Sequence, residues 1–176
     1  WFVSLPCLAD EVRVGWDDYP PYQISDKGTQ RGIDMDIISA VLEAQGHRVR
    51  FLKLPWARQL KMLESGELDI VMSASKSPER ERFARWSEAY RSERAALIGL
   101  AGKVMTVPSL ASVIETPGTR IAVIRDSSYP GEFERLLKDE DFKARLDFTA
   151  TARNSLLMLG AGRVTYVIDD PVTAQY

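Results

Sequence analysis

The sequence predicts a two-lobe α/β protein in which each lobe is a parallel β-sheet flanked by helices. Strands and amphipathic helices alternate along the 176 residues, and this alternation occurs twice, with an interruption near residues 99–108. Parallel strands joined through helices make right-handed crossovers and leave a ligand crevice at the carboxyl ends of the strands. Two such lobes connected by extended segments place a binding cleft between them.

The first lobe is expected to span residues 10–101. Residues 11–15 (EVRVG) alternate in polarity as a strand does, and an aromatic, proline-rich loop follows at 16–22. Residues 32–45 form a helical pattern with one apolar face, which ends at Gly46, where a left-handed cap is favoured. The other elements expected here are a strand at 48–52, a helix at 57–64, and strands at 69–72 and 95–99.

The second lobe is expected to span residues 102–170. A short helix can follow Pro108, up to Val113, and the alternation of strands and helices then restarts. The last six residues, 171–176, are interpreted as the start of a segment that returns to the first lobe. The elements expected in the second lobe are strands at 120–124, 146–149 and 164–168 and helices at 131–137 and 153–159.

Composition excludes several classes of function. The chain is 45% hydrophobic and 27% charged, with a net charge of −2, so it has no general attraction to nucleic acid or to an anionic membrane. No apolar stretch is long enough to span a bilayer. His47 and Cys7 are the only residues of their types, which makes a zinc site or a histidine-based catalytic triad improbable. No metal and no cofactor is expected.

The N-terminal residues 1–9 differ from the rest of the chain. They are apolar and uncharged, with small residues at Cys7 and Ala9, and polarity changes abruptly at Asp10. This pattern is typical of the end of a secretory signal peptide cleaved after Ala9. The sequence therefore predicts an exported protein.

Arg80 is the first candidate for ligand binding. Ser77 and Pro78 form a typical cap and first position of a helix, so Arg80 falls in the opening turn, where the helix dipole disfavours a cation. Such a placement suits an anion bound by unpaired N–H groups and a guanidinium fork. The alternative is that Arg80 belongs to the charged run 79–85 and points into water.

Aromatic and acidic side chains follow other strands at the same edge. Tyr19 and Trp56 could offer flat faces to an aliphatic stem or an ammonium group, or such rings could simply pack the rim of the core. Asp170 follows the strand 164–168 and could face Arg80 across the cleft, although a role as helix cap before Pro171 would also explain it. An arginine and an aspartate on opposite lobes would bind the two ends of a zwitterion and favour closure.

Five segments carry a family resemblance: VRVGWDDYPPY (12–22), GIDMDI (32–37), PWARQLKML (55–63), GELDIVM (66–72) and SKSPERERFARWSEAY (75–90). They resemble the extracellular (periplasmic) solute-binding proteins of polar amino-acid ABC transporters, family 3. The resemblance covers most of the chain from residue 11 onward, and residues 75–90 are its most specific part.

This resemblance implies a type II periplasmic-binding-protein-like fold, an amino acid or similar zwitterion as ligand, and an ABC permease as partner. It implies that Arg80 binds the carboxylate with Ser75 nearby, and that Asp170 receives the ammonium. It further implies ring platforms at Tyr19 and Trp56 and a backbone acceptor near Ser73. In the second lobe the family often has Thr or Ser followed by Gly, where this chain has Ser127 and Ser128 as carboxylate donors.

The family normally returns to the first lobe after the second, whereas this sequence stops at Tyr176. Either the sequence is incomplete or the first lobe lacks its last elements, in which case exposed apolar surface would favour a dimer. Two other functions share the scaffold: a ligand-sensing ectodomain of a receptor, and an enzyme resembling cyclohexadienyl dehydratase, for which no general acid stands out. Asp17 and Asp18 favour a cationic ligand side chain, and Arg58 favours an acidic one.

Overall fold

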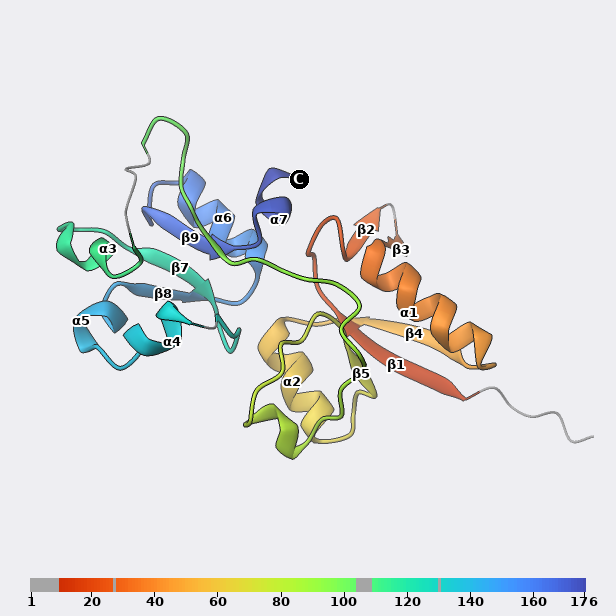
Figure 1. The fold of residues 1–176 in the computed structure, drawn as a ribbon. Coiled ribbons are helices and arrows are strands. Elements are labelled where there is room, and N and C mark those ends of the chain that lie inside the picture. The colour runs from red at the N-terminus through yellow and green to blue at the C-terminus, as the bar shows by residue number, and fades with distance from the viewer. Residues whose placement is uncertain (1–9, 27, 104–108, 130) are drawn as a thin grey trace, which may run out of the picture.

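The computed structural model describes residues 10–26, 28–103, 109–129 and 131–176. The expected signal-peptide remnant at residues 1–9 and the residue at position 108 lie outside the described residues. None of the described helices is both long and apolar enough to cross a membrane. Figure 1 shows two groups of elements connected by a long irregular segment before β6.

The first group is built on a three-stranded parallel sheet in the order β4-β1-β5. Its strands are β1 (Glu11–Trp16), β4 (Arg48–Lys53) and β5 (Ile70–Val71), and its helices are α1 (Ile33–Ala44) and α2 (Trp56–Glu64). Val14 pairs with a residue of each neighbouring strand and is fully buried. Trp16 and Met35 pack with it in a core under α1, so Trp16 ends β1 inside the core rather than beginning a loop.

A β-hairpin that the sequence reasoning missed precedes α1. It consists of β2 (Ile24–Asp26) and β3 (Thr29–Arg31), which pair antiparallel. Gly32, expected as the first residue of the helix, instead joins the hairpin to α1 with a φ of 131°. A Cβ at this position would lie 2.3 Å from the carbonyl oxygen of Tyr22, so glycine is required there by both backbone conformation and space.

The second group is built on a four-stranded sheet in the order β6-β9-β7-β8. Strand β7 (Ile121–Ile124) is parallel to both β8 (Leu146–Thr149) and β9 (Tyr166–Asp169), while β6 (Ala96–Ile98) is antiparallel to β9. A second core gathers around Val123 and Phe142. The helices of this group are α3 (Ser112–Glu115), α4 (Glu132–Leu136), α5 (Glu140–Lys143), α6 (Ala152–Gly160) and α7 (Pro171–Gln175).

The structure confirms the α/β class with parallel sheets flanked by helices, and it revises the position of one strand. The sequence places residues 95–99 in the first lobe, but β6 hydrogen-bonds to β9 of the four-stranded sheet. The irregular segment before β6 therefore connects the two groups (Figure 1). The division into lobes at residue 101 stays a prediction, and we propose that it falls before β6.

The helix expected to begin at Ser77 and Pro78 is only a short 3₁₀ turn, Arg80–Arg82. The hydroxyl of Ser77 does accept a hydrogen bond from the N–H of Arg80, at 3.3 Å. A three-residue turn has no appreciable helix dipole, because the dipole grows from many aligned peptide units. The predicted anion site at a helix N-terminus is therefore wrong, and any role of Arg80 must come from its side chain.

Candidate functional site

A cavity of about 340 Å³ lies between the two larger sheets, at the carboxyl ends of their strands. Segments after β1, β5, β7, β8 and β9 contribute to its walls, as the crevice rule for parallel sheets predicts. All the residues expected to bind ligand line it: Tyr19, Trp56, Ser73, Ser75, Arg80, Ser127, Ser128 and Asp170. The structure thus brings this set together, although their roles remain predictions.

Arg80 is buried, with 8% of its surface exposed. Its Nη1 donates to the carbonyl oxygen of Ser75 at 2.8 Å, and its Nη2 donates to the carbonyl oxygen of Asp126 at 2.7 Å. Burial lowers the pKa of Arg80 from its ordinary value, but a guanidinium stays protonated in proteins. Arg80 is therefore a cation held at the cavity wall by neutral carbonyl oxygens, so it does not point into water.

Trp56 shares a partner with Arg80. The Arg80 guanidinium lies 5.4 Å from the centre of the Trp56 ring. The indole Nε1 donates to the same Asp126 carbonyl oxygen at 3.0 Å. Asp126 follows β7 and adopts a φ of 60°, which is uncommon for a residue other than glycine. One carbonyl of the second group thus accepts two hydrogen bonds from the first group across the cavity.

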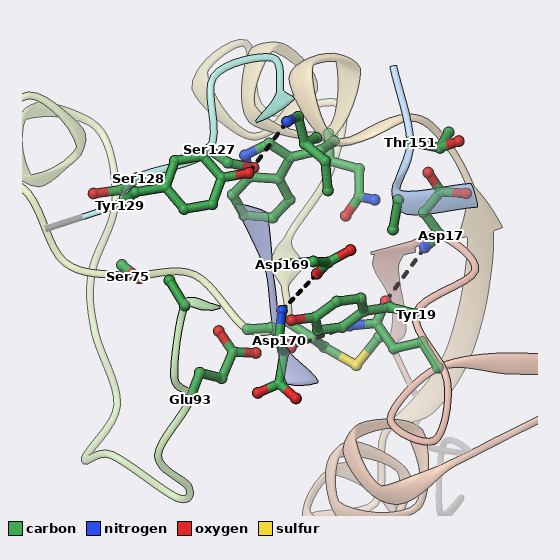
Figure 2. A pocket seen from close by; sticks show the side chains of 18 of the residues that line it. Asp17, Tyr19, Ser75, Glu93, Ser127, Ser128, Tyr129, Thr151, Asp169 and Asp170 are labelled. Atoms are coloured by element: carbon green, nitrogen blue, oxygen red, sulfur yellow. Dashed lines mark hydrogen bonds between the residues drawn. The ribbon is translucent and has the colours of Figure 1, made fainter. Parts of the chain in front are cut away.

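Asp169 is the last residue of β9 and was not among the predicted site residues. Figure 2 shows its carboxylate pointing into the middle of the pocket. Its Oδ1 accepts the N–H of Asp170 at 2.8 Å, and its buried Oδ2 has no hydrogen-bond partner among the residues that the structure describes. Burial raises the pKa of Asp169 to about 6, and the charges of Asp170 and Glu93 add to the effect.

Asp170 lines the same cavity but has a second task. Its Oδ1 accepts hydrogen bonds from the N–H groups of Val172 and Thr173, at 2.7 and 3.4 Å. It is therefore the N-cap of α7, with Pro171 in the first position, as the alternative interpretation of the sequence described. Of the two neighbouring aspartates, Asp169 accepts fewer hydrogen bonds with its carboxylate among the described residues.

A buried ion pair lies behind the cavity. Arg91 donates from Nε and Nη2 to the carboxylate of Asp34, at 2.8 and 3.1 Å, and stacks 3.8 Å from the centre of the Tyr22 ring. Burial alone would lower the pKa of Arg91, but these bonds and the charge of Glu93 hold it above its ordinary value. Asp34 is fully buried, and through this pair it joins α1 to the connecting segment.

The same ion pair engages Ser73. The Ser73 hydroxyl donates to Asp34 and accepts from Arg91 Nη2 at 2.7 Å. The N–H of Ser73 donates to the hydroxyl of Tyr90 at 3.2 Å. The side chain of Ser73 therefore belongs to the framework, and its carbonyl oxygen is the group left for the backbone role that the resemblance implies.

Glu93 and Asp17 also line the cavity and were not predicted as ligand-binding residues of the family. Burial raises the pKa of each of these carboxyls above its ordinary value. Burial also raises the pKa of Tyr19, and the charges of Glu93, Asp169 and Asp170 raise it further, so these groups lie close together. The sequence had indicated Asp17 as a group that favours a cationic ligand side chain, and Asp17 lies directly after β1, whereas no strand end marks Glu93.

The remaining wall is formed by the loop after β7. Figure 2 shows Ser127, Ser128 and Tyr129 together on one side of the pocket. The hydroxyl of Tyr129 accepts the N–H of Ile124 at 3.1 Å, which fixes the start of this loop. In the described part of the chain no group of His, Cys, Asp and Glu side chains could hold a metal ion.

Comparisons with known proteins identify relatives in sequence and in fold. A "Probable histidine-binding protein" of Neisseria gonorrhoeae is 29% identical over 75 residues, which are 42% of this chain and 28% of that protein. An ancestral arginine-binding protein, solved with glutamine bound, is similar in structure with a TM-score of 0.79 at 22% identity, covering 96% of this chain and 72% of that chain. Arginine-bound, truncated ArgBP from T. maritima gives a TM-score of 0.81 at 18% identity, covering 94% and 76%.

These identities are low, so the solved structures show a shared fold. The chain spans little more than a quarter of the length of the curated relative and about three quarters of the solved ones. The sequence model of one family, however, matches residues 12–155, which include elements of both groups and most of the residues that line the cavity, but not β9 or α7. The chain therefore belongs to the bacterial extracellular solute-binding proteins, family 3.

Proposed function

We propose that this protein captures an amino acid, or a similar small zwitterion, in the cavity between its two sheets. The observation that carries this proposal is a pair of opposite charges on opposite walls: the buried Arg80 fork on one side and the partnerless Oδ2 of Asp169 on the other. A carboxylate suits the first group and an ammonium the second, and each charge-assisted hydrogen bond contributes about 1.5–3 kcal/mol net.

In this proposal Asp169 accepts the ammonium, in place of Asp170, which the sequence resemblance implied. Asp170 has one carboxylate oxygen engaged in capping α7, whereas Asp169 has a buried oxygen aimed into the cavity. Asp170 then adds negative potential beside the ammonium. Tyr19 and Trp56 flank the stem of the ligand, and Ser127 and Ser128 offer donors to its carboxylate together with Ser75.

We further propose that the protein works outside the cytoplasm and delivers its ligand to an ABC permease, without chemical turnover. The family to which the chain belongs consists of extracellular binding proteins, which supports the location. Ligand capture between two lobes favours closure, because each end of the ligand is held by a different lobe. A closed, loaded form is what a transporter can distinguish from an empty one.

Thermal unfolding with each of the common amino acids tests the binding proposal. A ligand at a hundredfold its Kd stabilises the native state by about 2.7 kcal/mol, which raises the melting temperature by several degrees in a chain of this size. Arg80→Ala is expected to abolish the shift. Arg82→Ala removes an exposed guanidinium from the same turn and is expected to leave it intact. A full shift in Arg80→Ala would overturn the role of Arg80.

One observation supports an enzymatic alternative. Because the pKa of Asp169 is raised to about 6, this carboxyl is partly protonated in mildly acidic solution and could donate a proton to a leaving group. A dehydratase would consume a prephenate-like substrate, and an assay of substrate loss separates the two functions. We expect the substrate to disappear no faster than at the uncatalysed rate. Faster loss that is abolished in Asp169→Asn would overturn the binding proposal in favour of an enzyme.

A further inference from the structure

The cavity holds more carboxylates than the backbone of an amino acid can use. Asp17, Glu93, Asp169 and Asp170 line it, against the cations of Arg80 and Arg94. One carboxylate and one ammonium of the ligand satisfy Arg80 and Asp169. Asp18 also lines the wall and is paired with Lys53 at 2.5 Å, as Glu93 is with Arg91. Five carboxylates therefore line the cavity against two guanidinium groups, which leaves a place for a second positive group on the ligand.

Glu93 is fixed in place from behind. Its Oε1 lies 2.5 Å from Nη2 of Arg91, which is itself anchored by two hydrogen bonds to the buried carboxylate of Asp34. The Glu93 side chain is one-third exposed, and Figure 2 shows it beside Asp170 at the edge of the pocket. The bridge to Arg91 holds the carboxylate at the cavity, which reduces the entropy lost when a ligand cation binds it.

The carboxylates of the cavity repel one another. Burial is the main cause of the raised pKa of both Glu93 and Asp169; Arg91 lowers the pKa of Glu93 in part, and the charge of Asp170 raises the pKa of both groups. Among the described residues Oδ2 of Asp169 has no hydrogen-bond partner, which independently indicates a place for a ligand donor, since a buried polar atom normally finds a partner. A ligand with two positive groups would relieve the repulsion and satisfy that atom.

We propose that the cavity selects an amino acid with a cationic side chain, and that Glu93, held by Arg91, is the residue that selects it. This inference rests on the proposed function and gives it a substrate class. The α-ammonium binds Asp169, the α-carboxylate binds Arg80, and the side-chain cation binds the carboxylate of Glu93. Asp17, on the opposite side of the view in Figure 2, is the competing position for that cation.

Isothermal titration with arginine and citrulline provides the test, because citrulline has nearly the same shape with a neutral end group. We expect arginine to bind at least about tenfold more tightly than citrulline, the ratio that one charge-assisted hydrogen bond supplies. In Glu93→Gln this ratio is expected to fall to about twofold or less. Glu64→Gln removes the same charge from the exposed end of α2 and is expected to preserve the ratio.

The outcomes separate the two proposals. If citrulline binds as tightly as arginine to the native protein, the cationic class is overturned while amino-acid binding stands. If Asp17→Asn abolishes the ratio and Glu93→Gln keeps it, the assignment of Glu93 is overturned. If no amino acid binds at all, the proposed function itself fails. Thermal unfolding of each variant without ligand shows that it is folded.

Discussion

The two walls of the cavity hold their charged groups in different ways. On the side of the first sheet, the cations are partnered: Arg91 forms a buried ion pair with Asp34, and Arg80 donates to two carbonyl oxygens. On the side of the second sheet, Asp169 keeps a buried oxygen without a partner in the described chain. The cations near the first sheet therefore have acceptors within the chain, although Nη1 of Arg91 has none among the described residues, whereas Asp169 keeps one oxygen for a ligand.

This difference separates framework from binding groups. Removing one partner of a buried ion pair is strongly destabilising, because the other charge stays buried and uncompensated. A buried charge without a partner costs stability and is retained where a ligand completes it. Arg80 lies between these cases, since neutral carbonyl oxygens hold its cation without cancelling it.

The largest expected effect comes from breaking the framework pair. In Arg91→Met the carboxylate of Asp34 stays fully buried and loses two hydrogen bonds, so the free energy of unfolding is expected to fall by about 3–5 kcal/mol. Urea denaturation followed by tryptophan fluorescence measures this loss.

The matched control for this variant is Arg50→Met, which removes an exposed pair with Glu11 at 3.4 Å. Exposed pairs contribute little, so the change is expected to stay within about 1 kcal/mol. Similar losses in the two variants would show that the Arg91–Asp34 pair is not part of the framework. If Arg91→Met does not fold, Arg91→Lys, which keeps the positive charge, is expected to lose less.

The second prediction separates the neighbouring aspartates. Asp169→Asn is expected to weaken amino-acid binding by about 10- to 100-fold, the value of a charge-assisted hydrogen bond, without loss of stability in the empty protein. Asp170→Ala removes the cap of α7 and is expected to cost about 1 kcal/mol of stability, with the smaller effect on affinity. Titration calorimetry gives the affinity of each variant, and urea denaturation gives its stability. A larger loss of affinity in Asp170→Ala than in Asp169→Asn would show that Asp170 binds the ammonium.

The fold was largely predictable because local signals carry it. The apolar face of α1, and the alternation in β1, mark these elements in the sequence. The hairpin of β2 and β3 was missed, because each of its strands has only three residues and the hairpin lies on no apolar face. The placement of β6 was missed for another reason: its partner β9 is some 70 residues away, and an apolar segment fits either sheet.

The candidate site was predictable where its residues follow strands. Trp56 and Tyr19 were found in this way, whereas Arg80 was indicated by an expected helix that is only a 3₁₀ turn and by the family resemblance; all three line the cavity. The choice between Asp169 and Asp170 needed atomic detail, because both follow the same buried run and only hydrogen bonds show which one caps the helix. Glu93 lies in an irregular segment, so neither periodicity nor a strand end could have indicated it.

The third prediction uses pH to test whether Asp169 is the unsatisfied group. Its folded-state pKa is raised to about 6, mainly by burial. Only the ionised carboxylate attracts the ammonium of the ligand, and the ionised fraction falls about tenfold between pH 7 and pH 5. The affinity for the amino acid is therefore expected to fall about tenfold over this range. The empty protein takes up this proton more readily folded than unfolded, so the contribution of Asp169 to stability increases as pH falls through 6. Asp169→Asn should remove both trends, and their persistence would assign them to another carboxyl such as Glu93.

The smallest expected effect concerns the contact across the cavity. Trp56→Phe keeps an aromatic ring near Arg80 and removes the Nε1–H that donates to the Asp126 carbonyl oxygen. A hydrogen bond of this kind contributes about 1 kcal/mol, so if it supports the ligand-bound arrangement the affinity falls about fivefold. Trp86→Phe is the control, because the indole nitrogen of Trp86 has no hydrogen-bond partner within the described residues. Unchanged affinity in Trp56→Phe would contradict this role of the indole N–H. The hydrogen bond from Arg80 Nη2 to the Asp126 carbonyl oxygen would then be the contact across the cavity that matters for ligand binding.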